Sequence, residues 1–225
     1  MRRESSTVIA LVGGVSGGLL AGLAESPNVA VVNLPPEQAS NPRRPRPPAA
    51  VQLAGSGTGP EPPRPGWENG ALAMQEAARR RATYVVVPAD PLAGVAAAWR
   101  AMWDVSAGPD AAAGFEVAAA DSLLAWRANR FELPDYYLVI APSEETGPDL
   151  YLGPMRAARP HRVAVAASAA VRDTATDDTL AGAISLLGTL RSLPHGPWWP
   201  PLGELLDAAR HFYVGGLAES VQTPV

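Results

Sequence analysis

A glycine-rich segment near the amino terminus is the first feature that could do chemistry. Residues 13–18 read Gly-Gly-Val-Ser-Gly-Gly and follow a β-branched and aliphatic run over residues 7–12. A glycine-rich turn between a strand and a helix directs backbone N–H groups at an anion and needs no side chain to do so. A site for a phosphorylated ligand or nucleotide is therefore one interpretation of the segment, and a tight turn whose glycines let the first helix pack closely on the sheet is the plainer one. The residues assigned to this site are Gly13, Gly14, Gly17, Gly18 and, at the end of the next expected strand, Asn33.

The same segment contains the pattern Gly-x-Ser-x-Gly, with Ser16 at its centre. This pattern resembles the nucleophile elbow of the α/β-hydrolases, in which a sharp strand-to-helix turn exposes a serine. The resemblance covers residues 8–25 and implies a serine hydrolase in which Asp90, after another expected strand, orients His211 or His161 as the base. The α/β-hydrolase fold places several strands and an oxyanion-hole loop before the elbow, whereas six residues precede this strand.

Two further runs resemble the layout of ParA/MinD-type ATPases. They are residues 31–36, Val-Val-Asn-Leu-Pro-Pro, and residues 135–142, Asp-Tyr-Tyr-Leu-Val-Ile-Ala-Pro. The chain contains no lysine, so the residue that clamps phosphate and supports hydrolysis in that family is absent. Hydrolysis by that route is therefore excluded, and only ligand binding is left as an implication of the resemblance.

Composition excludes several other classes of function. The 225 residues include no cysteine, and all 18 basic residues are arginines, so disulfides, thiol nucleophiles, Schiff-base lysines and cysteine-bound zinc are impossible. Three histidines leave few ligands for a metal, and we predict neither a metal nor a cofactor. A formal net charge of −4 argues against nucleic acid as a partner, because its binding depends on neutralising phosphates.

A proline-rich segment is the first candidate contact surface. Residues 35–65 include ten prolines among 31 residues, and three arginines, Arg43, Arg44 and Arg46, lie between prolines. Proline at this density prevents strand pairing and helix continuation, so the segment predicts an extended linker or insertion. A solvated spacer is its plainer interpretation, and a partner that docks at the arginines is the alternative.

A double tryptophan is the second candidate contact surface. Trp198 and Trp199 lie in the run His-Gly-Pro-Trp-Trp-Pro-Pro over residues 195–201, which cannot be helical. Adjacent side chains diverge, so one indole can be buried while the other faces a partner. Exposed tryptophan in a rigid loop is typical of an interaction hot spot, and a loop pinned onto the core is the plainer interpretation.

Strands and helices alternate along the rest of the chain. This alternation predicts an α/β fold with a central, mostly parallel sheet of about five strands, helices on both faces, a proline-rich insertion and a helical carboxy-terminal part. Asp90 is expected to cap the third helix, and Gly215 with Gly216 to end the last one. The expected strands are 7–12, 28–34, 83–87, 136–141 and 162–167, with a short addition at 150–152, and the expected helices are 19–25, 68–81, 91–103, 111–129, 179–193 and 202–214.

The organisation that follows is one α/β domain interrupted once. Residues 1–34 form its first strand–glycine loop–helix–strand unit, residues 35–66 the insertion, and residues 67–225 the remainder. Residues 7–24 carry no charge and follow two arginines, so a signal peptide or membrane anchor is an alternative for them. The glycines in the middle of this run disfavour a continuous helix, and we expect a cytoplasmic protein without a membrane anchor.

The leading hypothesis is a non-catalytic binding or assembly protein that contacts a protein partner or a second copy of itself. It follows from the scarcity of catalytic side chains and from the proline/arginine-rich and double-tryptophan segments. The alternatives are a serine hydrolase that uses Ser16 and a binder of a small anionic ligand at residues 13–18.

Overall fold

The computed structural model describes residues 6–13, 15, 17–32, 67–103, 110–140, 149–166 and 186–221, with side chains up to residue 212. The prediction of a proline-rich insertion, with Arg43, Arg44 and Arg46, lies outside the described residues. So do the predictions for Gly14, Ser16 and Asn33.

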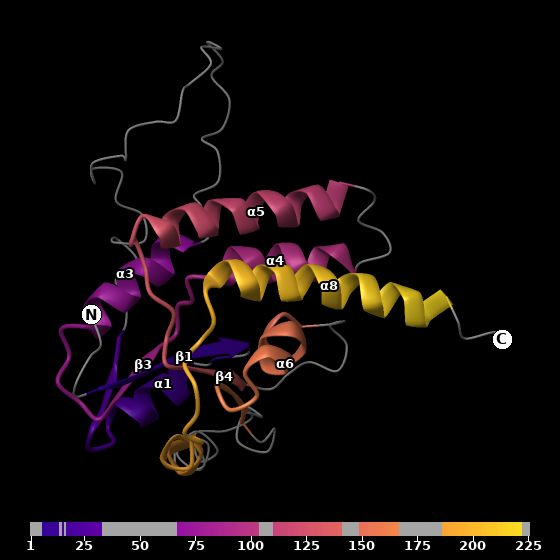
Figure 1. Cartoon of the computed structure of the whole chain (residues 1–225). Helices are drawn as coiled ribbons and strands as arrows, with labels where there is room; N and C mark the ends of the chain where they lie inside the picture. The colour runs from indigo at the N-terminus through magenta and orange to yellow at the C-terminus, as the bar shows by residue number, and fades with distance from the viewer. Residues whose placement is uncertain are drawn as a thin grey trace, which may run out of the picture.

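A five-stranded, fully parallel sheet forms the centre of the fold (Figure 1). The strands lie in the order β2-β3-β1-β4-β5, so the first strand of the chain is the central one. The predicted α/β class and the number of strands are confirmed. The strands are β1 (Thr7–Gly13), β2 (Val29–Val31), β3 (Tyr84–Val87), β4 (Tyr136–Ile140) and β5 (Val163–Val165).

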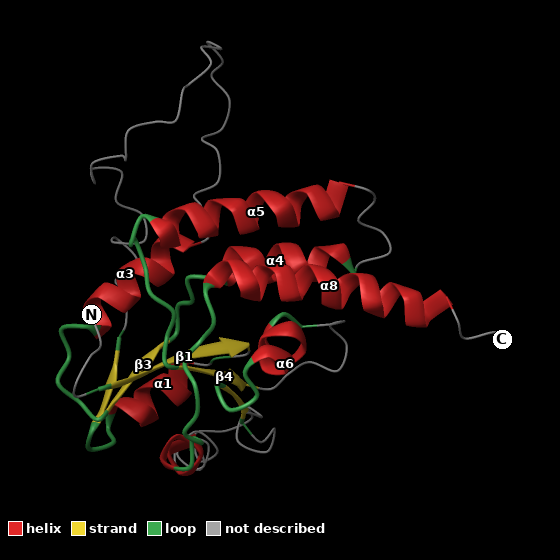
Figure 2. Ribbon diagram, in the orientation of Figure 1, coloured by secondary structure: helices red, strands yellow, loops and turns green. Residues whose placement is uncertain are grey.

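The helices form a layer on each face of the sheet (Figure 2). Helices α3, α4, α5 and α8 lie on one side, with α5 outermost, and α1 lies on the other side together with a helical segment at residues 186–191. The bounds are α1 (Gly17–Ala24), α3 (Trp67–Ala77), α4 (Ala93–Met102), α5 (Asp110–Arg127), α6 (Arg156–Ala158) and α8 (Leu202–Val221). Within the alternative membrane anchor, Thr7–Gly13 is thus a strand and Gly17–Ala24 a short helix.

Side-chain alternation along β1 explains the two layers. Ile9 and Leu11 face α1 and the 186–191 segment, and they pack in a cluster that includes Leu19 and Leu23. Ala10 and Val12 face the other layer, where the core centres on the fully buried Trp99 of α4. Because strands buried on both faces contain continuous apolar runs, the hydrophobic run at 8–12 is the expected pattern for a central parallel strand.

Three local predictions are wrong. Residues 150–152 do not form a strand: a helical turn kinked at Gly153, η1 (Tyr151–Met155), has Tyr151, Pro154 and Met155 buried in the core. Helix α8 continues through Gly215 and Gly216 to Val221, since the roughly 1 kcal/mol that a glycine costs a helix does not end it where helix-forming residues follow. The cap position of α4 is Leu92, not Asp90, and the Asp90 carboxylate accepts from the backbone N–H of Leu92 and from two tyrosine hydroxyls rather than from the first turn of the helix.

Among the described residues, no helix has both the length and the apolar character needed to cross a membrane.

Gly70 of α3 provides a test of the packing between α3 and the start of α4. A Cβ at this position would lie 2.1 Å from the Pro91 nitrogen and 2.3 Å from the Asp90 carbonyl carbon, which are backbone atoms. We expect Gly70→Ala to lower the free energy of unfolding by about 1–3 kcal/mol, the usual cost of overpacking. Urea denaturation measures the change. Gly114→Ala in α5 is the matched control, because a Cβ there meets nothing within 4 Å and should stabilise the helix by up to about 1 kcal/mol. Equal effects of the two variants would contradict the packing.

Candidate functional site

The carboxyl end of β1 meets the carboxyl end of β4 at the point where the sheet changes direction. The chain leaves β1 toward the β2 edge and leaves β4 toward the β5 edge, so the two following loops diverge. Ligands in open parallel sheets bind in the crevice at such a switch point. The predicted glycine loop therefore begins where an α/β fold most often places a ligand.

Gly13 ends β1 in a conformation that requires glycine. Its φ is +102°, and a Cβ would lie 2.3 Å from the carbonyl oxygen of Ile140, its partner in β4. Gly17 starts α1, and a Cβ there would meet no atom within 4 Å. Gly13 thus allows the backbone of β1 to approach the backbone of β4 closely, whereas the space beside Gly17 is open. Gly18 is the second residue of α1, so three of the five residues assigned to the ligand site are described at the β1–α1 junction.

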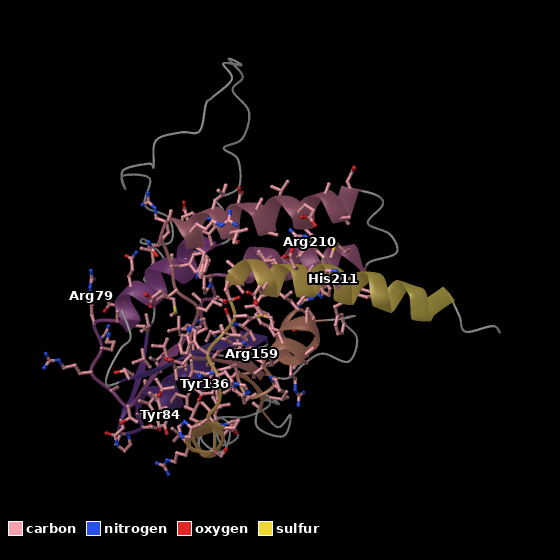
Figure 3. The ribbon with its side chains drawn as sticks, in the orientation of Figure 1. Arg79, Tyr84, Tyr136, Arg159, Arg210 and His211 are labelled. Carbon is pink, nitrogen blue, oxygen red and sulfur yellow. The ribbon has the colours of Figure 1, made fainter. Side chains whose placement is uncertain are left out.

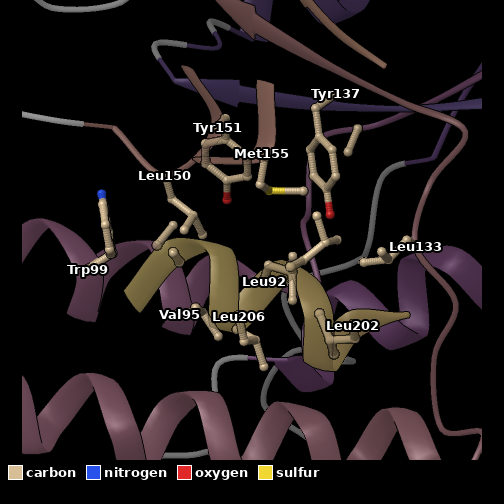
Figure 4. Packing of buried hydrophobic residues seen from close by; sticks show 14 of the residues in the cluster. Leu92, Val95, Trp99, Leu133, Tyr137, Leu150, Tyr151, Met155, Leu202 and Leu206 are labelled. Carbon is tan, nitrogen blue, oxygen red and sulfur yellow. The ribbon is translucent and has the colours of Figure 1, made fainter. Parts of the chain in front are cut away.

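Asp90 is a buried carboxyl between the sheet and the helical layer, with 6% of its surface exposed. The hydroxyl of Tyr137 on β4 donates to Asp90 Oδ1 at 2.9 Å, and the hydroxyl of Tyr151 donates to Oδ2. The backbone N–H of Leu92 also donates to this carboxylate. In Figure 4 both tyrosine hydroxyls point from the sheet side toward the helical layer. Asp90 is therefore held by donors from β4, η1 and the start of α4.

Burial raises the pKa of Asp90 above its ordinary value, and the hydrogen bonds from Tyr151, Leu92 and Tyr137 reduce that rise. Burial, followed by the charge of Asp90, raises the pKa of both tyrosines well above their ordinary value. The tyrosines therefore act as neutral donors over the physiological pH range.

The described members of the predicted Ser-His-Asp set have hydrogen bonds to other groups. His211 lies on α8 beside Arg210 (Figure 3), and its Nδ1 bonds to the carbonyl of Asp207 at 2.8 Å. Both carboxylate oxygens of Asp90 accept from tyrosines. The alternative base, His161, bonds through Nε2 to the carbonyl of Pro197 at 2.9 Å. No hydrogen bond joins Asp90 to His211 or His161 among the described residues, and the serine-hydrolase assignment stays a prediction.

The double-tryptophan loop is fixed in place by hydrogen bonds from side chains to backbone carbonyls. Trp199 is buried, and its Nε1 donates to the carbonyl of Pro134 at 2.8 Å. Trp198 keeps 44% of its surface exposed, and Arg159 Nε donates to its carbonyl oxygen at 2.8 Å. The predicted divergence of the two indoles is thus seen, with Trp199 inside and Trp198 outside.

Arg162 is the residue that organises this loop. Its guanidinium donates to the carbonyls of Gly196, Pro197 and Asp135 at 2.7, 3.0 and 3.2 Å. The same group stacks on the Tyr136 ring and on the Trp198 ring, 4.9 Å from each centroid. Arg162 is 8% exposed, so this charge is desolvated and its cation–π contacts are strengthened. One buried arginine thus sets the position of the exposed indole.

Basic groups surround Trp198 on the surface. Arg159 and His161 each bond to the loop, and Arg156 is exposed one helical turn before Arg159. Because Nε2 of His161 bonds to a carbonyl, this nitrogen carries a proton, so Nδ1 is the acceptor in the neutral ring. The result is an aromatic side chain with a basic border.

Sequence reasoning missed the roles of Arg162 and Tyr151. Arg162 immediately precedes β5, and nothing in the sequence distinguishes it from Arg156 and Arg159, because the carbonyls that it binds come from segments 27 to 35 residues away. Tyr151 carried no signal, since its position depends on the kinked turn η1. The described residues contain no group of three or more histidine, aspartate or glutamate side chains that could hold a metal ion.

Comparisons with protein-family models, with curated proteins and with solved structures find no match for the chain.

Asp90 makes stability depend on pH with a defined sign. Because its folded-state pKa is raised, protonation of Asp90 favours the folded state. The stability that Asp90 contributes is complete below the unfolded-state pKa of about 3.9 and is lost as the pH rises through the folded-state pKa. We expect the wild type to lose stability relative to Asp90→Asn as pH rises from about 4 to 7, by at most about 1.4 kcal/mol per pH unit for one proton. Urea denaturation at several pH values measures the difference. Asp121→Asn, at an exposed carboxyl of α5, is the control, and parallel curves for wild type and Asp90→Asn would contradict the assignment.

Proposed function

We propose that this protein is a non-catalytic binding or assembly protein that contacts a protein partner through Trp198. The observation that supports the proposal is an exposed indole on a loop whose backbone is held in place by Arg159 and Arg162. Tryptophan is enriched at the energetic centres of protein interfaces. A loop held in one conformation before binding loses less entropy when the partner docks.

The border of the indole indicates the chemistry of the partner. Arg159 and His161 bond to the loop that carries Trp198, and Arg156 is exposed one helical turn before Arg159. A partner segment with an apolar or aromatic anchor flanked by acidic side chains complements such a surface in shape and in charge. Arg43, Arg44 and Arg46 belong to the proposal on sequence grounds alone.

Trp198→Ala tests the proposal. Removal of a hot-spot tryptophan costs about 2 kcal/mol or more, which is a loss of affinity of about 30-fold. A photo-cross-linking residue at position 198 first identifies the partner in a cell extract, and titration calorimetry of the purified pair then compares Trp198→Ala with the wild type. We expect the adduct at position 198 and the loss of affinity in the alanine variant.

The matched control is Phe212, an exposed aromatic residue on α8 with 41% of its surface accessible. A cross-linker at position 212 should give no adduct with that partner, and Phe212→Ala should leave the affinity within about twofold, as non-contact surface changes do. Unchanged affinity in Trp198→Ala would refute the proposal.

We propose as a second candidate function the binding of a phosphorylated ligand or nucleotide at residues 13–18. The observation that favours it is the position of Gly13 and the start of α1 at the switch point of the sheet. Such a site would use backbone N–H groups at the start of α1, which suits a chain that has no lysine.

Gly17→Ala tests this candidate without a cost in packing. The open space at Gly17 accommodates a methyl group, so stability should be unchanged or raised by up to about 1 kcal/mol, while the methyl group obstructs close approach of a phosphate. Thermal unfolding is followed with ATP, ADP, GTP, pyrophosphate and inorganic phosphate. A ligand at 100 times its Kd stabilises the folded state by about 2.7 kcal/mol, so we expect a shift in Tm of several degrees for the wild type and a smaller one for the variant. Equal shifts, or no shift with any of the five probes, would exclude the candidate.

A further inference from the structure

The outer face of α5 carries a stripe of residues that the fold itself does not use. The buried residues of this helix are Phe115, Ala119, Ser122 and Ala125, and they face α4 and α8. On the opposite face, Val117 and Leu124 each keep 63% of their surface exposed. We call this face the α5 stripe, and its exposed members are Asp110, Ala113, Val117, Ala120, Leu124 and Arg127.

The spacing of the α5 stripe is that of a helix–helix contact. Successive members are 3, 4, 3, 4 and 3 residues apart. Alternation of three and four residues places side chains on one seam that a second helix can pack against. Figure 1 shows α5 as the outermost helix of its layer, so the seam faces away from the sheet.

We propose that the α5 stripe binds the α5 stripe of a second copy of this chain, with the two helices antiparallel about a twofold axis. The order of residues in the α5 stripe is the reason for proposing a second copy of the chain as its partner. The spacing is the same in both directions, so each residue of one helix faces one defined residue of the partner. The pairs are Asp110 with Arg127, Ala113 with Leu124, and Val117 with Ala120, and the twofold axis repeats each of them.

Every one of these pairs is complementary. An acid at the start of the helix meets a base at the end of the other helix, and each large side chain meets an alanine. Interdigitation of large and small side chains is what close packing of two helices requires. An isologous interface must be complementary to itself in this manner, whereas an unrelated partner would impose no such symmetry on the stripe.

The parallel arrangement lacks this complementarity. It would place Asp110 against Asp110 and Arg127 against Arg127, and the alanines would face each other across gaps.

In the antiparallel arrangement Asp121 borders the seam, and the two copies of Asp121 are offset by five residues, about 7 Å along the helix axis. Glu116, on the other border, is already bound by Arg210 at 2.7 and 2.8 Å.

The contact is that of one helix of 18 residues, about 27 Å long. An interface of this size falls below the roughly 1,200 Å² of stable complexes, so the expected dimer is a reversible one. It involves no residue of the Trp198 surface. Failure of the dimer and failure of the proposed partner binding are therefore separate results.

Sedimentation of the full chain from about 5 to 500 µM, the range for a weak interface, measures the association. We expect a monomer–dimer equilibrium, and Leu124→Glu should raise its dissociation constant at least tenfold. Ala112→Glu is the matched control, since Ala112 is exposed on α5 outside the stripe and its substitution should leave the equilibrium unchanged. A monomer at every concentration overturns the proposal, because the α5 stripe would then not bind a second copy of the chain.

Charge reversal and cross-linking test the antiparallel pairing. Asp110→Arg and Arg127→Asp should each weaken the dimer, and the double variant should restore it, with Tm recorded for each variant to show that the fold is retained.

The chain has no cysteine, so Ala113→Cys and Leu124→Cys can be mixed and treated with a short thiol-specific cross-linker. We expect 113–124 products. The antiparallel arrangement separates two copies of residue 113 by about 16 Å along the axis, so a predominance of 113–113 products, or no recovery in the double reversal, overturns the pairing.

Discussion

A carboxyl group removed from water must be compensated by hydrogen bonds, and the position of Asp90 makes this requirement a constraint on the whole fold. Its donors are all neutral: two tyrosine hydroxyls that lie 47 and 61 residues further along the chain, and the backbone N–H of the nearby Leu92. Each unmade bond to a buried polar group costs about 1–3 kcal/mol. The end of β3, the strand β4 and the turn η1 must therefore assemble together.

The same cluster is connected to the surface. The Tyr137 ring that donates to Asp90 also packs edge-on against Trp199, with 5.7 Å between the ring centroids. Trp199 holds one end of the loop that exposes Trp198, and Arg162 holds the other part of that loop through the carbonyls of Gly196 and Pro197. An interior hydrogen-bond group, a buried aromatic pair and a desolvated arginine are thus successive supports for one exposed side chain.

The sequence predicts the elements of this fold better than the connections between their side chains. The uncharged run at 8–12 predicts a strand buried on both faces, and Pro88 and Gly13 mark the ends of their strands, because these signals are local. The roles of Tyr151 and Arg162 depend on which elements become neighbours, and nothing in the residues around them states this. The glycine loop was found through its composition, whereas its place at the switch point follows only from the strand order. The predicted end of the last helix at Gly215 and Gly216 is wrong for a related reason: the tendency of glycine to end a helix is weak where the residues on both sides favour helix.

The strand order also has a consequence for how the chain acquires its structure. The central strand is made first during synthesis, yet its two neighbours are β3 and β4, and 127 residues separate Val8 from Asp135, to which it is hydrogen-bonded. Pairings between such distant segments form slowly, since loop closure precedes any compensating contact. The apolar run of β1 therefore remains without one of its two native neighbours until β4, at Tyr136–Ile140, has left the ribosome. Protection of the nascent chain by a chaperone during this interval would prevent the aggregation to which an unpaired apolar strand is prone.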